Sequence, residues 1–303
     1  MKQVDIALAT YNGEKFIREQ IESIQKQTYS NWRLWISDDC SSDSTVSVIN
    51  ELMLMDERIN LINCCRQGGV INNFNKALMH TTAEYILLCD QDDIWPSERL
   101  SNLVDAIYRI EREKDNSGIM VFTDLCLIDE EKNIIAESFY KVNKINPNSN
   151  LKREKLLWNS SVYGCTVIMN RKLLNASLPI PQFAHMHDQW LALNASRNDG
   201  LYYYEYASIF YRQHTGNVVG GNKKNWFQKS RSIKKNLKTI SNCTKNTIAC
   251  LRHEAKQNNQ GYNYFTNVSF AFKEVLPSIL SGKRKIFSLL VFIGLIIKRC
   301  YIY

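Results

Sequence analysis

A series of short apolar runs, each ending in a polar segment, restricts the fold more than any other feature of the sequence. The runs lie at residues 4–9, 32–37, 59–62, 85–89 and 119–123. Between them apolar residues recur at helical spacing, as in Ile17, Ile21 and Ile24. Alternating strands and helices form parallel sheets with helices on both faces. The sequence therefore predicts an α/β fold with a mostly parallel central sheet.

Aspartates cluster where the predicted strands end. Asp38 and Asp39 follow one strand, and Asp90-Gln91-Asp92-Asp93 follows another. In open α/β sheets ligands bind outside these carboxyl ends. Buried together, the carboxylates would repel one another unless a cation bound them, and a divalent ion held by carboxylates and diphosphate oxygens meets that need. The alternative is a solvated turn whose aspartates cap the next helix.

Composition and charge divide the chain into two parts. The 303 residues are 45% hydrophobic and contain no apolar run of about 18 residues, which excludes disordered, collagenous and polytopic membrane proteins. Residues 1–221 carry a net charge of −6, whereas residues 222–303 carry +14. We expect one main domain over residues 1–221, divided near residue 125, and a basic helical region over 222–303.

The cysteines and the first residues indicate a reducing compartment. The nine cysteines are odd in number, lie mostly in apolar runs and show no zinc-type spacing, so we expect buried, reduced thiols. Residues 1–5 lead directly into the first run without the apolar region of a signal peptide, so we expect a cytoplasmic protein.

Three ordered motifs resemble the family 2 glycosyltransferases. They are Val-Asp-Ile-Ala-Leu-Ala-Thr-Tyr-Asn-Gly at 4–13, Ser-Asp-Asp-Cys-Ser-Ser-Asp-Ser-Thr at 37–45 and Asp-Gln-Asp-Asp-Ile-Trp at 90–95. The resemblance implies the A-type nucleotide-diphospho-sugar transferase fold, whose Rossmann-like sheet carries helices on both faces. It also implies a catalytic domain over 1–221, with a nucleotide half at about 1–125 and an acceptor half at about 126–221. Ala9 replaces the proline usual in the family, without loss of a chemical group.

The same resemblance implies roles in binding a nucleoside diphosphate sugar. Ala9 and Tyr11 would pack on the base, and Asp39 would accept a hydrogen bond from the imide of uracil or thymine. Asp90 would lie near the ribose, and Asn73 near the ribose and diphosphate.

The family pattern further implies a site for Mn²⁺ or Mg²⁺. Asp92 would ligate the metal, and Asp93 is the second candidate. His214 either completes the metal shell or holds the diphosphate. Arg212 is the other candidate for holding the diphosphate, since imidazole and guanidinium groups both bind phosphate oxygens. A solvated loop is the alternative for Arg212 and His214.

Candidate residues that act on the acceptor lie in the motif His187-Asp188-Gln189-Trp190. In this family an acid at the start of such a helix is the general base, and here His187 replaces the usual first acid of a pair. Inverting transfer needs one carboxylate to take the proton of the attacking hydroxyl, so Asp188 is the predicted catalytic base. The alternative is that Asp188 only stabilises the helix, because a negative charge at a helix N-terminus interacts favourably with the helix dipole. Gly164, Cys165 and Trp190 are the predicted acceptor contacts, by position.

The basic region predicts helices that associate with a membrane surface. Apolar residues recur at helical spacing between 233 and 251, with lysines between them. The apolar run 286–297 would form a helix of roughly 18 Å, shorter than the ~30 Å hydrocarbon core. We expect a surface anchor, and the alternative is packing on the protein body or a partner subunit. No nucleic-acid module accompanies these basic residues, and both a monomer and a homo-oligomer are compatible with the sequence.

These patterns together predict a metal-dependent inverting glycosyltransferase on the inner face of the cell membrane. It would move a sugar from a UDP- or dTDP-linked donor to a growing, lipid-linked glycan of a bacterial O-antigen or capsule. Rhamnose from dTDP-rhamnose ranks ahead of galactose or glucose from UDP. The alternatives are a sugar-nucleotide nucleotidyltransferase, which usually has a Gly-rich loop with Arg where residues 11–14 are Tyr-Asn-Gly-Glu, and a non-catalytic glycan- or membrane-binding protein.

Overall fold

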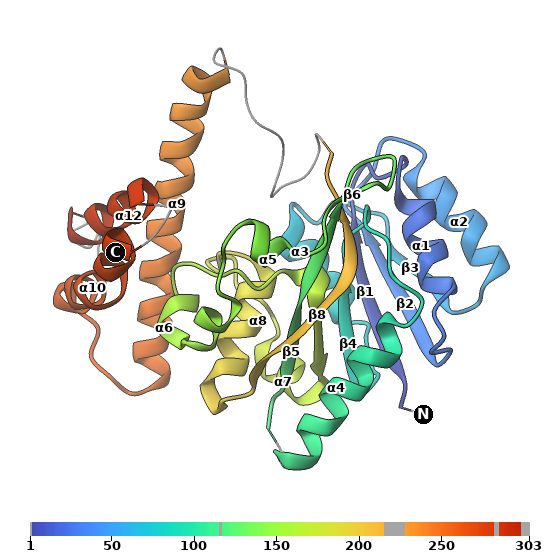
Figure 1. Ribbon diagram of the computed structural model, residues 1–303, viewed down its shortest axis with the longest axis horizontal. Coiled ribbons are helices and arrows are strands. Elements are labelled where there is room, and N and C mark those ends of the chain that lie inside the picture. Colours follow the sequence, from blue (N-terminus) through green and yellow to red (C-terminus); the bar gives the residue numbers. More distant parts are fainter. Residues whose placement is uncertain (1, 115–116, 215–227, 282–284, 298–303) are drawn as a thin grey trace. The chain divides into compact units, whose positions relative to one another are not determined.

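The structure is a computed structural model that describes residues 2–114, 117–214, 228–281 and 285–297 (Figure 1). The side chains of 228–238, 281 and 285 also lie outside the description. The chain forms two compact units. The first comprises Met1–Leu151, Ser161–Gln182 and Met186–Asn222, and the second comprises Lys152–Ser160, Phe183–His185 and Lys223–Tyr303. The expected division between residues 221 and 222 falls outside the described residues.

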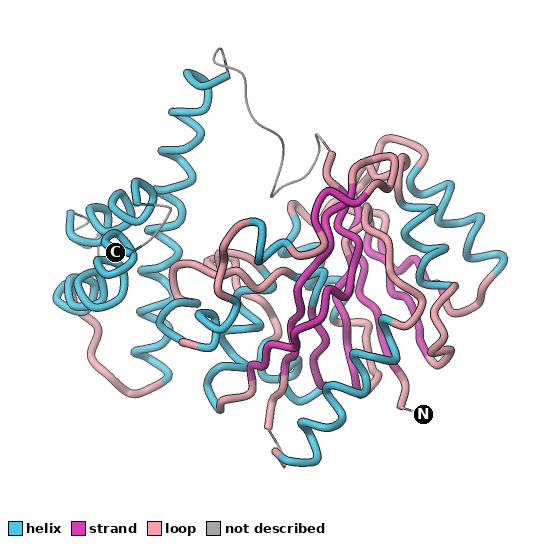
Figure 2. Tube along the Cα trace, viewed as in Figure 1, coloured by secondary structure: helices cyan, strands magenta, loops and turns pink. Residues whose placement is uncertain are grey.

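One mixed, mostly parallel sheet forms the centre of the first unit (Figure 2). Four strands pair in parallel in the order β3-β2-β1-β4: β3 (Ile59–Asn63), β2 (Trp32–Asp38), β1 (Val4–Thr10) and β4 (Tyr85–Cys89). Antiparallel β7 (Val167–Asn170) joins β4 to β5 (Met120–Ile128). On β5, β6 (Ile134–Ala136) is antiparallel and β8 (Leu201–Arg212) is parallel. The predicted fold class is confirmed.

Helices cover the sheet because each buries an apolar stripe on it. Helices α1 (Ile17–Gln25), α2 (Thr45–Met55) and α4 (Arg99–Glu113) share a core with the β1 residues Val4, Ile6 and Leu8. Since side chains alternate along a strand, the remaining β1 side chains point to the other face, where α3 (Val70–Leu78) contacts β1 and α8 (His187–Ala195) contacts α3. Shorter helices are α5 (Phe139–Val142), α6 (Arg153–Leu156) and α7 (Arg171–Ser177).

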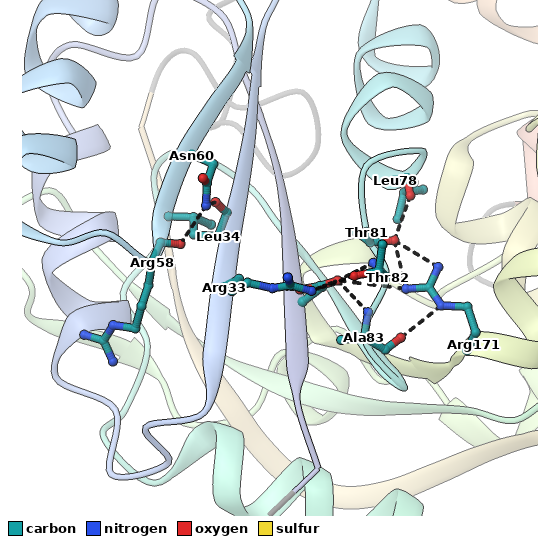
Figure 3. Close-up of polar contacts among 10 residues, drawn as sticks. Arg33, Leu34, Arg58, Asn60, Leu78, Thr81, Thr82, Ala83 and Arg171 are labelled. Carbon is teal, nitrogen blue, oxygen red and sulfur yellow. Dashed lines mark hydrogen bonds and ion pairs between the residues drawn. The ribbon is translucent and has the colours of Figure 1, made fainter.

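Buried Asp5 joins several elements at the amino ends of the parallel strands. Its carboxylate accepts hydrogen bonds from Arg33 Nε at 3.1 Å and from the amide of Ala83 at 2.7 Å, and Arg171 Nη2 lies 4.0 Å away. Figure 3 shows Arg33 and Arg171 reaching toward Thr82 and Ala83 from opposite sides. A buried charge is costly unless paired, so this arrangement fixes β1, β2 and the segment before β4 relative to one another.

Three local predictions differ from the structure. The sequence predicts separate strands at 201–204 and 209–212, but both segments belong to one strand, β8, whose register with β5 shifts on both sides of Asp124. The sequence also predicts a helix near residues 151–158, where the structure has the single turn α6, preceded by a 3-10 turn at Pro147–Leu151. Among the eight described cysteines, Cys40, Cys64 and Cys65 are exposed rather than buried.

The second unit is helical in its described part. It contains α9 (Gln228–Gln257), α10 (Tyr264–Phe270), α11 (Leu276–Ser281) and α12 (Lys285–Ile297), with a π-helical segment at Ala271–Val275. Helix α12 buries Ser288, Val291 and Leu295 on one side. Its opposite side exposes an apolar stripe, Ile286, Leu289, Ile293 and Ile297. Among the described residues, no helix combines the length and apolar character that crossing a membrane requires.

Candidate active site

A cavity of about 620 Å³ opens at the carboxyl ends of β1 and β4 in the first unit. It brings together ten of the thirteen predicted site residues: Ala9, Tyr11, Asp39, Asn73, Asp90, Asp92, Gly164, Cys165, Asp188 and His214. The other three, Asp93, Trp190 and Arg212, do not line the cavity. The elements that supply these side chains are far apart in the sequence, so the sheet creates the site.

The loop after β1 is fixed by Gln91. The Gln91 side-chain oxygen accepts hydrogen bonds from Thr10 Oγ1 at 2.6 Å and from the amide of Tyr11 at 2.8 Å. A Cβ on Gly13 would lie 2.5 Å from that oxygen, so a larger residue there would displace the Gln91 side chain. Exposed Tyr11 is thereby held at the cavity wall, where a planar base can pack on its ring.

Asp39 is held by a run of backbone amides. Its Oδ1 accepts from the amides of Gln67 and Gly68, and its Oδ2 accepts from the amide of Gly69 at 3.0 Å. Burial acts to raise the pKa of Asp39, but these hydrogen bonds from Gly68, Gln67 and Gly69 outweigh it and lower the pKa. The side chain is therefore ionised, and Oδ2, which accepts from Gly69, keeps a second lone pair for a donor on a ligand.

Asn73 contributes to the same wall. Its side-chain nitrogen donates to the backbone oxygen of Thr10 at 3.1 Å, while its buried side-chain oxygen has no partner among the described residues. The side-chain amide thus fixes the first loop, and its oxygen is a buried acceptor without a partner among the described residues.

Asp92 and His214 form the predicted metal-binding pair. His214 Nε2 lies 2.8 Å from Asp92 Oδ2, and both side chains line the cavity. Asp90 lines it nearby, and burial, then Asp92 and Asp188, raise the pKa of Asp90. Carboxylate oxygens and an imidazole nitrogen are ligands for Mn²⁺ or Mg²⁺, and a bound cation would relieve the repulsion that raises this pKa.

Asp93 lies beneath the cavity rather than on it. The side chain is 1% exposed; its Oδ1 accepts from the amide of Arg212 at 3.2 Å, and its Oδ2 has no partner in the described part of the chain. Burial, then Asp92 and Asp90, raise the pKa of Asp93. Ligand atoms of Asp90, Asp93 and Cys165 do lie within 4.8 Å of one another.

Arg212 is a buried brace and does not reach the cavity. It donates from Nε to the backbone oxygen of Asp92 and from Nη1 to that of Glu130, both at 3.0 Å, and its Nη2 pairs with Glu19. The side chain is 1% exposed. The prediction that Arg212 holds the diphosphate therefore gives way to a positioning role beneath Asp92 and Asp93.

A second buried arginine was missed by the sequence analysis. Arg99 donates from Nη1 to the backbone and side-chain oxygens of Ser208, and its Nη2 donates to the backbone oxygen of Cys165. Burial lowers the pKa of Arg99 to about 10. In the sequence it resembles an ordinary helical arginine, because its partners on β8 lie 109 residues away.

Asp188 lies in the first turn of α8 and faces the cavity. Its Oδ2 accepts from the amide of Gly164 at 2.9 Å, and its Oδ1 accepts from the amide of Gln189 at 2.6 Å. A Cβ on Gly164 would lie 2.7 Å from His187 Nε2, which explains the glycine. These contacts orient the carboxylate and leave lone pairs for an acceptor hydroxyl.

Trp190 is directed away from the cavity. Its indole nitrogen donates to the backbone oxygen of Ser177 at 2.8 Å, and the side chain is 6% exposed. Trp190 follows Asp188 by two residues, which places it on the other side of α8, so the cavity does not include this predicted acceptor contact. Cys165 does line the cavity, with a thiol whose pKa burial raises.

Further lining residues were not among the thirteen predicted site residues. They are Thr10, Asn12, Gly13, Lys15, Phe16, Gly69, Val70, Gln91, Glu130, Tyr163, Met186, His187 and Tyr211. Most belong to the loops already identified by their aspartates. The sequence pattern could not indicate Lys15, Glu130 or Tyr163 as site residues, since an isolated residue in a polar loop shows no periodicity.

Solved structures share the fold of this chain. The chain matches Staphylococcus aureus TarS 1–349, solved in complex with UDP-GlcNAc, with a TM-score of 0.58 at 18% identity, covering 97% of this chain and 81% of that one. It matches the mannosyltransferase PcManGT from Pyrobaculum calidifontis, solved with GDP-Man and Mn²⁺, with a TM-score of 0.55 at 17% identity, covering 99% and 87%. The fold is that of the A-type glycosyltransferases.

The family follows from the sequence match. Residues 5–178 match the model of glycosyl transferase family 2, and the chain belongs to this family. The protein is therefore a glycosyltransferase, as the three motifs predicted.

Curated relatives have related activities. Escherichia coli WfaP, a UDP-Glc:alpha-D-GlcNAc-diphosphoundecaprenol beta-1,3-glucosyltransferase, is 30% identical over 84% of this chain and 93% of its own length. E. coli WfgD, named for the same reaction, is 32% identical over 65% and 71%. The dTDP-rhamnosyl transferase RfbG of Shigella flexneri is 26% identical over 71% and 74%.

Proposed function

We propose that this enzyme transfers a sugar, with inversion, from a UDP- or dTDP-linked donor to a lipid-linked glycan of a bacterial surface polysaccharide. One observation carries the proposal: four carboxylates from three separate stretches of the chain line a single cavity, namely Asp39, Asp90 with Asp92, and Asp188. Relatives named for transfer to GlcNAc-diphosphoundecaprenol support a lipid-linked acceptor.

The donor is bound by its base and its diphosphate. Asp39 accepts the imide hydrogen of uracil or thymine, the ring packs on Tyr11, and the ribose lies near Asp90. UDP-glucose is the first donor to test, because WfgD and WfaP are both named for UDP-Glc at 30% identity or more. The more distant RfbG supports dTDP-rhamnose as the second.

Asp92 and His214 fit a divalent cation, since both line the cavity and lie in contact. The cation, Mn²⁺ or Mg²⁺, neutralises charge on the departing diphosphate when it is bound there. Arg212 fixes the backbone of Asp92 and so orients the carboxylate. PcManGT, a protein of the same fold, was solved with Mn²⁺, which supports this site.

Asp188 acts as the general base. Its carboxylate is oriented by the amides of Gly164 and Gln189. It takes the proton of the acceptor hydroxyl while that oxygen attacks the anomeric carbon, on the face opposite the diphosphate. Gly164 and Cys165 form the adjoining wall of the acceptor site.

We further propose that residues 1–221 are the catalytic domain and that 222–303 attach it to the inner face of the cell membrane as a peripheral protein. The exposed apolar stripe of α12 and the +14 charge of 222–303 support this attachment, because anionic headgroups attract basic residues beside an apolar face.

Release of UDP from UDP-glucose in the presence of Mn²⁺ tests the function. Asp92→Asn should lower the rate by about 100-fold or more, the scale at which groups that stabilise developing charge act. The matched control is Asp105→Asn, at an exposed position of α4. The proposal fails if Asp92→Asn retains the rate of the wild type, or if no UDP- or dTDP-sugar is turned over.

A further inference from the structure

A second cavity, of about 830 Å³, opens in the same compact unit. Its wall comes from β5, β8 and the segment from residue 136 to residue 148. It shares no lining residue with the first cavity, so the proposed donor and metal residues lie elsewhere.

Tyrosines give this cavity both ring faces and hydroxyl groups. Tyr140, Tyr203 and Tyr206 line it. The Tyr140 hydroxyl donates to the backbone oxygen of Ser161 at 2.7 Å, whereas the hydroxyls of Tyr203 and Tyr206 have no hydrogen-bond partner within the described ranges. Burial, then Asp124 and Glu205, raise the pKa of Tyr203 to about 12, so its hydroxyl stays neutral and able to donate.

The charges of the lining disfavour anions. Asp124, Glu137 and Glu205 contribute carboxylates, against the single ammonium of Lys141. A nucleotide or an acidic glycan would therefore meet net repulsion. A neutral saccharide would meet no such repulsion. Its C–H faces can pack on the aromatic rings, and its hydroxyls can donate to the carboxylates and accept from the phenols.

An aromatic cluster adjoins both cavities. Tyr163 lines the first cavity and packs against Phe139, with ring centroids 5.2 Å apart, and against Tyr140, at 6.3 Å. Tyr140 lines the second cavity and packs edge-on against Tyr203 at 5.9 Å. The two cavities are therefore lined on adjacent sides by rings of one aromatic cluster.

We propose that the second cavity binds neutral sugar units of the acceptor glycan that lie beyond the unit receiving the new sugar. The proposal rests on the proposed function for its assignment to the acceptor. Tyr206 and Tyr203 supply the stacking and donor groups, and Glu137 and Glu205 accept hydrogen bonds from sugar hydroxyls.

Saturation-transfer NMR on the full chain tests this site with maltotriose, cellotriose and laminaritriose, and with trigalacturonate as an anionic comparator. At least one neutral trisaccharide should bind, and trigalacturonate should bind more weakly. Tyr206→Ala should weaken neutral binding about fivefold or more, and Tyr206→Phe, which keeps the ring, by less. The matched control is Tyr108→Ala, which removes an exposed tyrosine of α4 outside both cavities.

UDP-glucose hydrolysis measured on the same variants separates this proposal from the proposed function. Tyr206→Ala should leave hydrolysis unchanged. If a neutral trisaccharide binds in a way that depends on Tyr206 but the protein does not hydrolyse UDP-glucose, the cavity proposal is supported and the proposed function is rejected. The cavity proposal is overturned if no neutral trisaccharide binds, if binding survives in both Tyr206→Ala and Tyr203→Ala, or if light scattering shows that Tyr206→Ala dissociates a dimer.

Discussion

The histidine ring at position 187 packs where the family pattern has an acid. It stacks on Phe74 with centroids 3.9 Å apart, is 4% exposed, and has no hydrogen-bond partner for either ring nitrogen among the described residues. Burial lowers the pKa of His187 below its ordinary 6.5. A neutral ring suits this contact, whereas an ionised acid there would be costly.

Stability should therefore fall in acid partly through His187. Its lowered pKa means that the unfolded chain binds a proton more readily than the folded protein, so unfolding is favoured as pH falls below about 6.5. In His187→Gln, which does not titrate, the melting temperature should drop less between pH 7 and pH 5 than in the wild type, by about 2 °C or more. Differential scanning calorimetry measures this. An identical pH dependence in both proteins would contradict the assignment of a buried neutral ring.

Strand β8 supports the site through two buried arginines. Arg212 belongs to the strand and binds the backbones of Asp92 and Glu130, and Arg99 binds Ser208 of the strand. Neither arginine lines the cavity, yet both fix segments that do. The element thus acts on the chemistry by positioning.

Arg212→Met should lower stability strongly. It removes one of the two cations that pair with Glu19, the other being Lys132, and it takes the Arg212 donors from the backbone oxygens of Asp92 and Glu130, at a cost of about 3 kcal/mol. Urea unfolding measures the loss. Exposed Arg109 of α4 offers the matched control, Arg109→Met, expected within about 0.5 kcal/mol of the wild type. Equal stability of the two variants would show that Arg212 is not a structural brace.

Sequence patterns predicted elements whose signal is local. Strands β1 to β5 were recognisable as apolar runs, and the aspartates at their ends marked the site because parallel strands place their carboxyl ends together. Strand β8 was divided in two because its bulged register interrupts the alternation. Arg99, Gln91 and Trp190 could not be assigned correctly, since their partners are set by tertiary packing and not by neighbours in the chain.

The whole molecule combines an acidic first part with a strongly basic second part. The apolar stripe of α12, residues 286, 289, 293 and 297, follows helical spacing and is exposed. Exposed apolar stripes of this kind mark interaction surfaces. Beside the many lysines of 222–303, the stripe fits an anionic membrane.

Charge placed on that stripe should release the protein from membranes. Ile286→Glu combined with Ile293→Glu should reduce binding to vesicles that contain anionic phospholipid by about tenfold or more, because each glutamate replaces buried apolar contact with repulsion. Vesicle sedimentation measures the change. Leu54→Glu, at a position of α2 that is 89% exposed, is the matched control. Unchanged partition of the double variant would refute attachment through α12.

The central claim is that Asp188 removes a proton in the same cavity in which Asp39 and Asp92 hold the donor. The most direct measurement compares the Kd for UDP-glucose with kcat for transfer to a lipid-linked oligosaccharide acceptor, in the wild type and in Asp188→Asn. A base acts only in the transition state, so kcat should fall by roughly 10²–10⁴-fold while the Kd changes by less than about threefold. A loss of donor affinity as large as the loss of rate, or a kcat that is retained, would contradict the account.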